Sequence, residues 1–167
     1  VINGNLMNYL YFRTPGGDFS TRLTTKDLKA YTLRGGQKID VLQLLLQAEG
    51  VEMLGVKGDE DNIVEVFSPT GYGRIKREDK GWSYGAQRQD PLQMGDLADG
   101  EVRSDAEWLT ATSSAAFPFG VVRMGRLVFH PDCGDIVVTA ALDYDLAEDY
   151  ELFVENYRGG HGGLRAE

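Results

Sequence analysis

Cysteine is nearly absent from this sequence, and long apolar runs are absent altogether. The single cysteine, Cys133, rules out an intrachain disulfide and cannot by itself form a thiolate zinc site. No apolar run approaches the roughly 18 to 20 residues that a membrane-spanning helix needs. Residues 1–13 lack the charged start and long apolar stretch of a secretory signal peptide. These absences leave the compartment of the protein undetermined.

Basic residues are also scarce relative to acidic ones. The chain has 17 Lys and Arg against 26 Asp and Glu, a formal net charge of −9. Such a surface repels phosphate backbones and anionic lipids, which argues against nucleic-acid binding and against membrane binding. It does not exclude a locally positive site built around a metal ion.

The content of hydrophobic residues is that of a folded domain. Hydrophobic residues make up 42% of the 167 residues, a composition typical of globular proteins. This length predicts a single domain over residues 1–167, or one large piece of a bigger domain. The chain begins with Val1 and ends shortly after a glycine-rich stretch, so we expect both ends to be cuts from a longer chain.

The first half of the chain alternates helical and extended patterns. Apolar residues recur at helical spacing over residues 38–49, which predicts a helix there with Gly50 as its C-terminal cap. Residues 51–56 then read as a strand, and this helix–glycine–strand unit is typical of α/β and of α+β folds. Three further short strands, separated by turns, predict a small antiparallel meander over residues 63–67, 72–76 and 82–84.

The second half predicts two helices and a buried strand. Ser104 and Glu107 have the spacing of a capping box, which predicts a helix over residues 105–112. Pro118 suits the first turn of a second helix that runs to about Phe129. Residues 135–142 are apolar enough to form a central strand of the sheet.

His161 is the strongest candidate for a chemical role, because two glycines flank it on each side. Glycines allow positive φ and a close approach of the backbone to a ligand, and a neutral imidazole is a common zinc ligand. The alternative is a glycine-rich linker with an incidental exposed histidine. His130 has a simpler explanation, since the residue before a proline is disfavoured in a helix and so marks a helix end.

The remaining candidates favour structural roles. Cys133 has no neighbouring base in sequence, so we expect a small packed or loop residue. Trp82, Tyr84 and Trp108 can stack a substrate, but aromatic residues more often fill a core or an interdomain face. The chain also has a run of carboxylates, which consists of Asp143, Asp145, Glu148 and Asp149. Such a run can bind a hard cation such as calcium, but it is usually part of the solvated surface.

Several short segments occur in an order that is more specific than any one of them. They are Asn3-Gly4-Asn5 with Tyr9-Leu10-Tyr11, Asp90-Pro91-Leu92, residues 104–109 (SDAEWL), Ala116-Phe117-Pro118, residues 134–138 (GDIVV) and His161-Gly162-Gly163-Leu164. In this order the chain resembles the type I phosphodiesterases and nucleotide pyrophosphatases of the alkaline phosphatase superfamily. One departure is that Phe119 follows Pro118, where the family often has an aspartate.

The resemblance implies a fold, a chemistry and one site residue. Members of this family have an α/β sandwich around a mostly parallel sheet, two metal ions that are usually zinc, and a threonine or serine nucleophile. Three aspartates and three histidines hold the metals, and the last histidine lies in a His-Gly motif. His161 is therefore expected to be a metal ligand. The nucleophile and the other ligands are expected upstream of Val1.

Two functional hypotheses follow. The first is that residues 1–167 are the C-terminal part of a metal-dependent phosphodiesterase or nucleotide pyrophosphatase and are inactive alone. In that case the parent protein acts on a phosphate ester or a nucleotide, and the chain packs against the rest of its own catalytic domain. The alternative is a non-catalytic α+β binding or interaction module.

Overall fold

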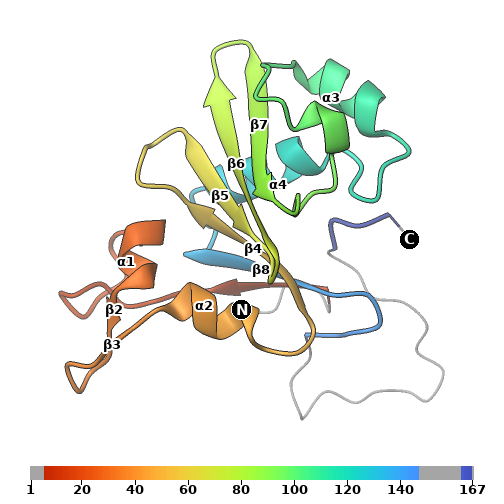
Figure 1. Ribbon diagram of the computed structural model, residues 1–167. Coiled ribbons are helices and arrows are strands. Elements are labelled where there is room, and N and C mark those ends of the chain that lie inside the picture. Colours follow the sequence, from red (N-terminus) through yellow and green to blue (C-terminus); the bar gives the residue numbers. More distant parts are fainter. Residues whose placement is uncertain (1–5, 147–162, 167) are drawn as a thin grey trace.

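The computed structural model describes residues 6–146 and 163–166, which form an α+β domain (Figure 1). Its main element is a six-stranded sheet of strand order β1-β8-β4-β5-β6-β7, in which every neighbouring pair is antiparallel. Of the two classes that the sequence allowed, α/β and α+β, the structure therefore shows α+β. The elements are β1 (Met7–Leu10), α1 (Thr25–Lys29), β2 (Tyr31–Thr32), β3 (Lys38–Ile39), α2 (Val41–Leu46), β4 (Val51–Lys57), β5 (Ile63–Phe67), β6 (Gly71–Glu78), β7 (Gly81–Arg88), a 3-10 turn (Gly95–Leu97), α3 (Asp105–Thr112), α4 (Gly120–Phe129) and β8 (Ile136–Ala140).

The predicted meander and the predicted inner strand are both present. β5, β6 and β7 pair consecutively, and β6 and β7 are longer than the sequence indicated. β8 lies between β1 and β4, and all five of its residues are buried. The expectation of burial was wrong for Leu142, which lies beyond the end of β8 with 71% of its surface exposed.

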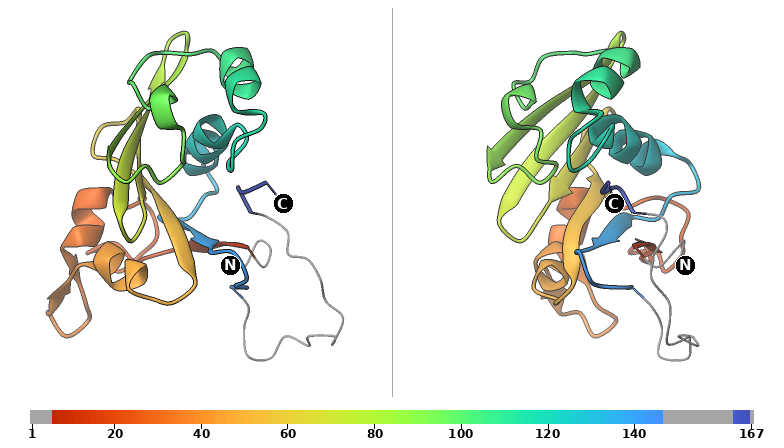
Figure 2. Two further views of the ribbon diagram at one scale, coloured as in Figure 1. Left: turned by 45° about the vertical axis from the view of Figure 1, so that its right-hand side comes forward. Right: turned by 90° about the vertical axis from the view of Figure 1, so that its right-hand side faces the viewer.

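The sheet has a hydrophobic core on each face, because successive side chains of a strand point to opposite sides. Met53, Val64 and Val137 belong to the core beneath α3 and α4. Leu54 and Val138 belong to the second core, which also contains residues of α1 and α2. The two further views show the same order of layers, with α1 and α2 on one side of the sheet and α3 and α4 on the other (Figure 2).

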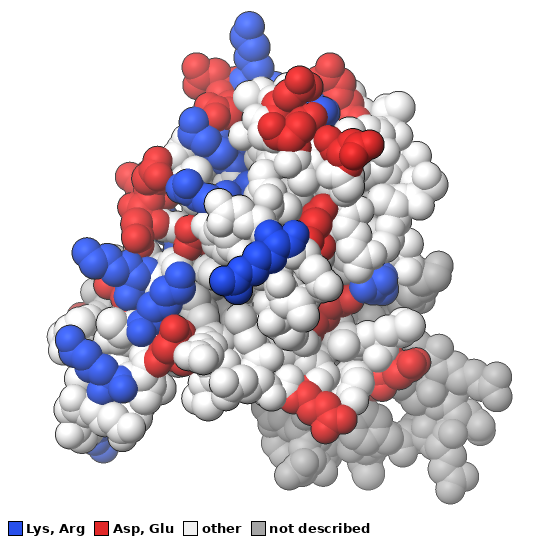
Figure 3. Space-filling view, in the orientation of Figure 1, with Lys and Arg blue, Asp and Glu red and all other residues white. Residues whose placement is uncertain are grey.

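The meander carries charged side chains on the face that α4 does not cover. Arg74 of β6 lies 3.0 Å from Glu60 and 3.9 Å from Glu65, and Lys76 lies 2.7 Å from Glu78. Basic and acidic side chains intermingle over this part of the molecule, on the left of Figure 3. Exposed pairs of this kind add little stability.

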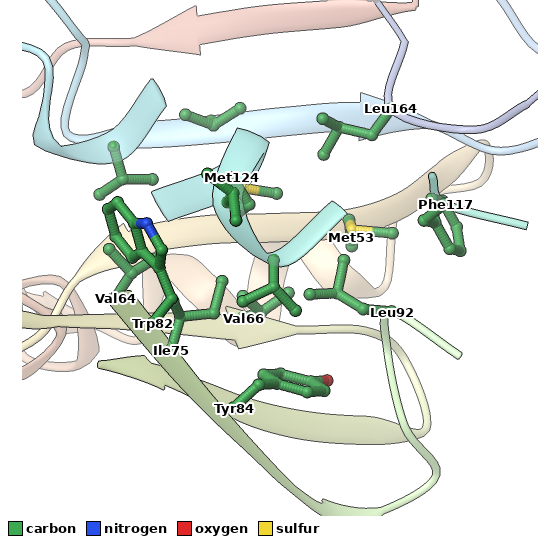
Figure 4. Packing of buried hydrophobic residues seen from close by; sticks show 14 of the residues in the cluster. Met53, Val64, Val66, Ile75, Trp82, Tyr84, Leu92, Phe117, Met124 and Leu164 are labelled. Atoms are coloured by element: carbon green, nitrogen blue, oxygen red, sulfur yellow. The ribbon is translucent and has the colours of Figure 1, made fainter. Parts of the chain in front are cut away.

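α4 packs closely on the sheet because glycines remove side chains at its contacts. A Cβ at Gly55 of β4 would lie 2.3 Å from the sulfur of Met124, and a Cβ at Gly125 would lie 2.5 Å from the ring of Trp82. Figure 4 shows Met124 of α4 among the side chains of the sheet that make up this core. Trp82, Tyr84 and Trp108 all fill this core, as the sequence indicated.

The first predicted helix is shorter than expected. Lys38–Ile39 form β3 and pair with β2, so the helix cannot begin there. Asp40 caps α2 instead, with its carboxylate accepting a hydrogen bond from the backbone N–H of Gln43 at 2.9 Å. The helix ends at Leu46, and Gly50, at φ +83°, lies in the turn that leads into β4 rather than at the helix end.

The helices α3 and α4 lie where the sequence predicted them, except that α4 begins two residues later than expected. The capping box of Ser104 and Glu107 is present at the start of α3. α4 begins at Gly120 and not at Pro118, because Phe119 adopts a left-handed conformation and donates its backbone N–H to the Thr112 hydroxyl at 2.8 Å. Among the described helices none is long and apolar enough to cross a membrane.

Candidate functional site

The C-terminal segment Gly163–Ala166 is docked against the body of the domain. The guanidinium of Arg123, in α4, donates to the carbonyl oxygens of Gly163 at 2.7 Å and of Leu164 at 2.9 Å. The Leu164 side chain is 2% exposed and lies in the core beneath α4 (Figure 4). The backbone N–H of Ala166 donates to the carbonyl of Ala116 at 2.8 Å, which extends the docking beyond the leucine.

Arg165 adds a charged contact to this docking. Its Nε donates to the Glu52 carboxylate at 3.0 Å, and its guanidinium lies over the Phe117 ring, 4.6 Å from the centroid. Both partners belong to the folded domain, one to β4 and the other to the segment before α4. The two residues that directly follow His161-Gly162 are thus part of a segment that is held by charge, hydrogen bonds and apolar burial together.

A cavity of about 840 Å³ opens beside the docked segment. Its apolar lining comes mainly from β1, α4 and the docked segment, and includes Met7, Leu127 and Leu164. Its polar lining includes the basic side chains of Arg123 and Arg126. A volume in the range of 300 to 1,000 Å³ is typical of small-molecule sites.

The two arginines of this cavity are already engaged within the domain. Arg123 binds the two carbonyls of the docked segment, and Arg126 pairs with the Asp105 carboxylate. His130, which also lines the cavity, is the C-terminal cap residue of α4, in line with the structural role predicted for it. Its Nδ1 accepts a hydrogen bond from the backbone N–H of Asp132 at 3.3 Å. The cavity therefore offers shape and apolar surface but no unengaged arginine, and Asp132 adds an exposed carboxylate to its lining.

Cys133 lines the same cavity but is not an activated nucleophile. Burial raises the pKa of its thiol above the usual value, which keeps the thiol protonated near neutral pH. It is 3% exposed and packs in the core beneath α4. The prediction of a small packed or loop residue is confirmed, because Cys133 is packed and lies outside the helices and strands.

His161, the predicted metal ligand, lies outside the described residues, as do Glu148 and Asp149 of the carboxylate run. Asp143 and Asp145 are described and exposed. Within residues 6–146 and 163–166 no cluster of three or more histidine, cysteine or acidic side chains is arranged to hold a metal ion. The described residues by themselves therefore do not make a zinc site.

Sequence reasoning missed the residues that hold the docked segment. Arg123 lies in an otherwise mostly apolar helix, between the buried residues Val122 and Met124, and an arginine between two apolar residues was the available signal. Leu164 carried no signal beyond its apolarity, because its partners are far away in the chain. No family model, curated protein or solved structure matches this chain. The resemblance drawn from the motifs therefore depends on those residues alone.

Proposed function

We propose that this chain is the C-terminal portion of a metal-dependent phosphodiesterase or nucleotide pyrophosphatase that hydrolyses phosphate esters. In this proposal His161 supplies one ligand of a two-zinc site, and the chain is incomplete by itself. The order of its short motifs supports the proposal, from residues 90–92 through residues 104–109 to the His-Gly-Gly-Leu sequence at 161–164.

The observation that carries the proposal is the docking of Gly163 and Leu164. These two residues are the described half of the His-Gly-Gly-Leu motif, and Arg123 binds the carbonyls of both. A metal ligand has to be held in place by the residues around it, because outer-shell contacts fix its orientation. A linker has no need of a buried leucine and a dedicated arginine. The docking therefore favours a positioned motif over a glycine-rich linker.

The antiparallel sheet limits where residues 1–167 can lie in a catalytic domain of this family. The sandwich of the family is built on a mostly parallel sheet, whereas every strand pair described here is antiparallel. We therefore propose that the six-stranded sheet is a layer added beside the parallel sheet. Gly163 lies against the Leu6 side chain, so the two described ends of the chain meet.

The zinc site of this proposal needs ligands from outside the described residues. His161 would supply one of them, and the rest of the catalytic domain would supply the others together with the threonine or serine nucleophile. One imidazole does not hold zinc with useful affinity alone. The isolated chain of residues 1–167 is therefore expected to hydrolyse no chromogenic phosphodiester, with or without added zinc.

The test compares two histidine variants of the longer parent protein. His161→Ala should release zinc and lower turnover by more than the roughly 10- to 100-fold typical of outer-shell partners. His130→Ala is the matched control, because His130 is an exposed helix-end residue, and it should keep both the metal content and the rate. Zinc is measured by elemental analysis and turnover with a chromogenic phosphodiester.

Two results would contradict the proposal. Full zinc content and a near-normal rate in His161→Ala would leave the non-catalytic α+β module as the explanation. Zinc-dependent turnover by the purified chain of residues 1–167, abolished by a chelator, would show that the chain is a complete enzyme.

A further inference from the structure

A second cleft, of about 610 Å³, lies on the face of the sheet opposite the docked segment. It is formed by α1 and α2, by the turn between β5 and β6, and by the end of β7. Its floor includes Leu42 and Phe67, which belong to the core beneath α1 and α2. The cleft thus lies on a different layer of the molecule from the cavity beside α4.

The floor of this cleft is apolar and aromatic. Leu42 is 2% and Phe67 is 9% exposed, so only a small part of each side chain faces the opening. Tyr72 lies beside Phe67, with the ring centroids 5.2 Å apart. The Tyr72 hydroxyl donates to the Glu65 carboxylate at 2.6 Å, which satisfies the polar end of this side chain. A floor of this kind accepts an apolar group of about the size of one ring.

Two basic side chains stand around the opening, in a protein of net charge −9. The Lys29 ammonium lies over the Phe67 ring, 5.1 Å from its centroid, and Arg88 lines the cleft at the end of β7. Neither forms an ion pair with an acidic side chain within residues 6–146 and 163–166. Asp40 is the acidic group of the lining, and its carboxylate caps α2 by accepting from the Gln43 N–H. Positive charge is therefore in excess here.

The backbone holds Arg88 in a conformation that an arginine rarely adopts. Its φ is 63°, in the left-handed region, and the chain then turns so that Gln89 lies beside Gly71. A Cβ at Gly71 would lie only 1.7 Å from the Gln89 carbonyl oxygen, so this approach requires glycine. The Thr70 hydroxyl bonds the Gln89 side chain and fixes the same turn. Strained residues of this kind cluster at binding sites, where the strain serves to aim a side chain.

We propose that this cleft binds a small organic anion, in which a phosphate or carboxylate group is attached to an apolar portion about the size of one ring. The oxyanion lies between Lys29 and Arg88, and the apolar portion rests on Leu42, Phe67 and Tyr72. The amide side chains of Gln43 and Gln87, which also line the cleft, provide hydrogen bonds at its sides. Nothing in this site depends on His161 or on a metal, so the inference stands or falls independently of the proposed phosphodiesterase.

The test uses the chain of residues 1–167 and three small probes, with binding followed by isothermal titration and by amide NMR shifts. Phenyl phosphate carries both features of the proposed ligand, benzoate replaces the phosphate by a carboxylate, and phenol lacks the charge. Phenol should bind at least roughly tenfold more weakly than the better anion, because a charge-assisted hydrogen bond is worth about that factor or more. The comparison of phenyl phosphate with benzoate shows which oxyanion the cleft prefers. Shifts should concentrate around Phe67 and Tyr72.

Two variants and one control assign the binding to the two basic side chains. Lys29→Gln and Arg88→Gly should each weaken anion binding by roughly tenfold. Glycine accepts a φ of 63° without strain, so Arg88→Gly should melt no lower than the unmodified chain while it loses affinity. Lys80→Gln removes an exposed lysine of the β6–β7 turn and should leave binding unchanged.

The proposal is overturned by any of three results. The first is equal affinity for phenol and both anions. The second is unchanged anion affinity in Lys29→Gln and Arg88→Gly, or an equal loss in Lys80→Gln. The third is the absence of titratable shifts in the cleft with phenyl phosphate and with benzoate at millimolar concentration.

Discussion

Replacement of Leu164 by alanine tests whether the C-terminal segment is part of the folded domain. Leu164 is 2% exposed, and its substitution removes three buried carbon atoms. At roughly 0.8 kcal/mol for each buried methylene, the lost transfer free energy is about 2.4 kcal/mol. The cavity term should be small, because Leu164 already lines the cavity beside α4 and the space it leaves joins that opening. We expect Leu164→Ala to lower the free energy of unfolding by about 2 kcal/mol.

The measurement is urea unfolding followed by tryptophan fluorescence. Trp82 and Trp108 report on the core beneath α4, where both are buried. Leu142→Ala is the matched control, because the same atoms are removed from a leucine that is 71% exposed. Its effect should stay within about 0.5 kcal/mol, as for most surface substitutions. The docking is refuted as a contribution to stability if the two variants unfold at the same urea concentration with the same slope.

A double-mutant cycle with Arg123 sharpens this test. Arg123 and Leu164 hold the same segment, so removal of one should release part of what the other stabilises. The cost of Arg123→Ala and Leu164→Ala together should therefore be less than the sum of the two single costs. Full additivity would mean that the segment does not dock as a unit.

Two further predictions concern the body of the domain. Gly125→Ala should lower the free energy of unfolding by about 1 to 3 kcal/mol, because the new Cβ would lie 2.5 Å from the Trp82 ring. Gly85→Ala is the control and should cost less in the same urea assay, because no atom lies within 4 Å of its new Cβ. Equal costs of the two substitutions would exclude a close packing of α4 on the sheet. The hydrogen bonds from Arg103 lower the pKa of Asp99 below its usual 3.8, so the contribution of this carboxylate to stability is present above about pH 4 and is lost as pH falls below it. The difference in unfolding midpoint between the unmodified chain and Asp99→Asn should accordingly shrink below about pH 4, and a difference that is constant with pH would contradict this reasoning.

Local patterns predicted those elements whose stabilising contacts are near in sequence. The capping box of Ser104 and Glu107 spans three residues, so the start of α3 follows from the sequence alone. The turns of the meander are likewise local, and β5, β6 and β7 were found in the expected order. The prediction was wrong where two elements share one apolar pattern: Ile39 continues the helical spacing of α2 but pairs with Tyr31 in a hairpin.

The sequence by itself determined that this protein is a folded domain with an acidic surface, a meander, a buried strand within residues 135–142 and a glycine-flanked histidine at position 161. Only the tertiary structure decided that β1, β8 and β4 join the meander in one antiparallel sheet, because strand direction depends on which strands pair and not on their own composition. It also decided that Leu164 is a core residue held by Arg123, and that Lys29 and Arg88 line one cleft. The residues of these two pairs are 41 and 59 positions apart in the chain, and no periodicity within a short segment can encode such a distance.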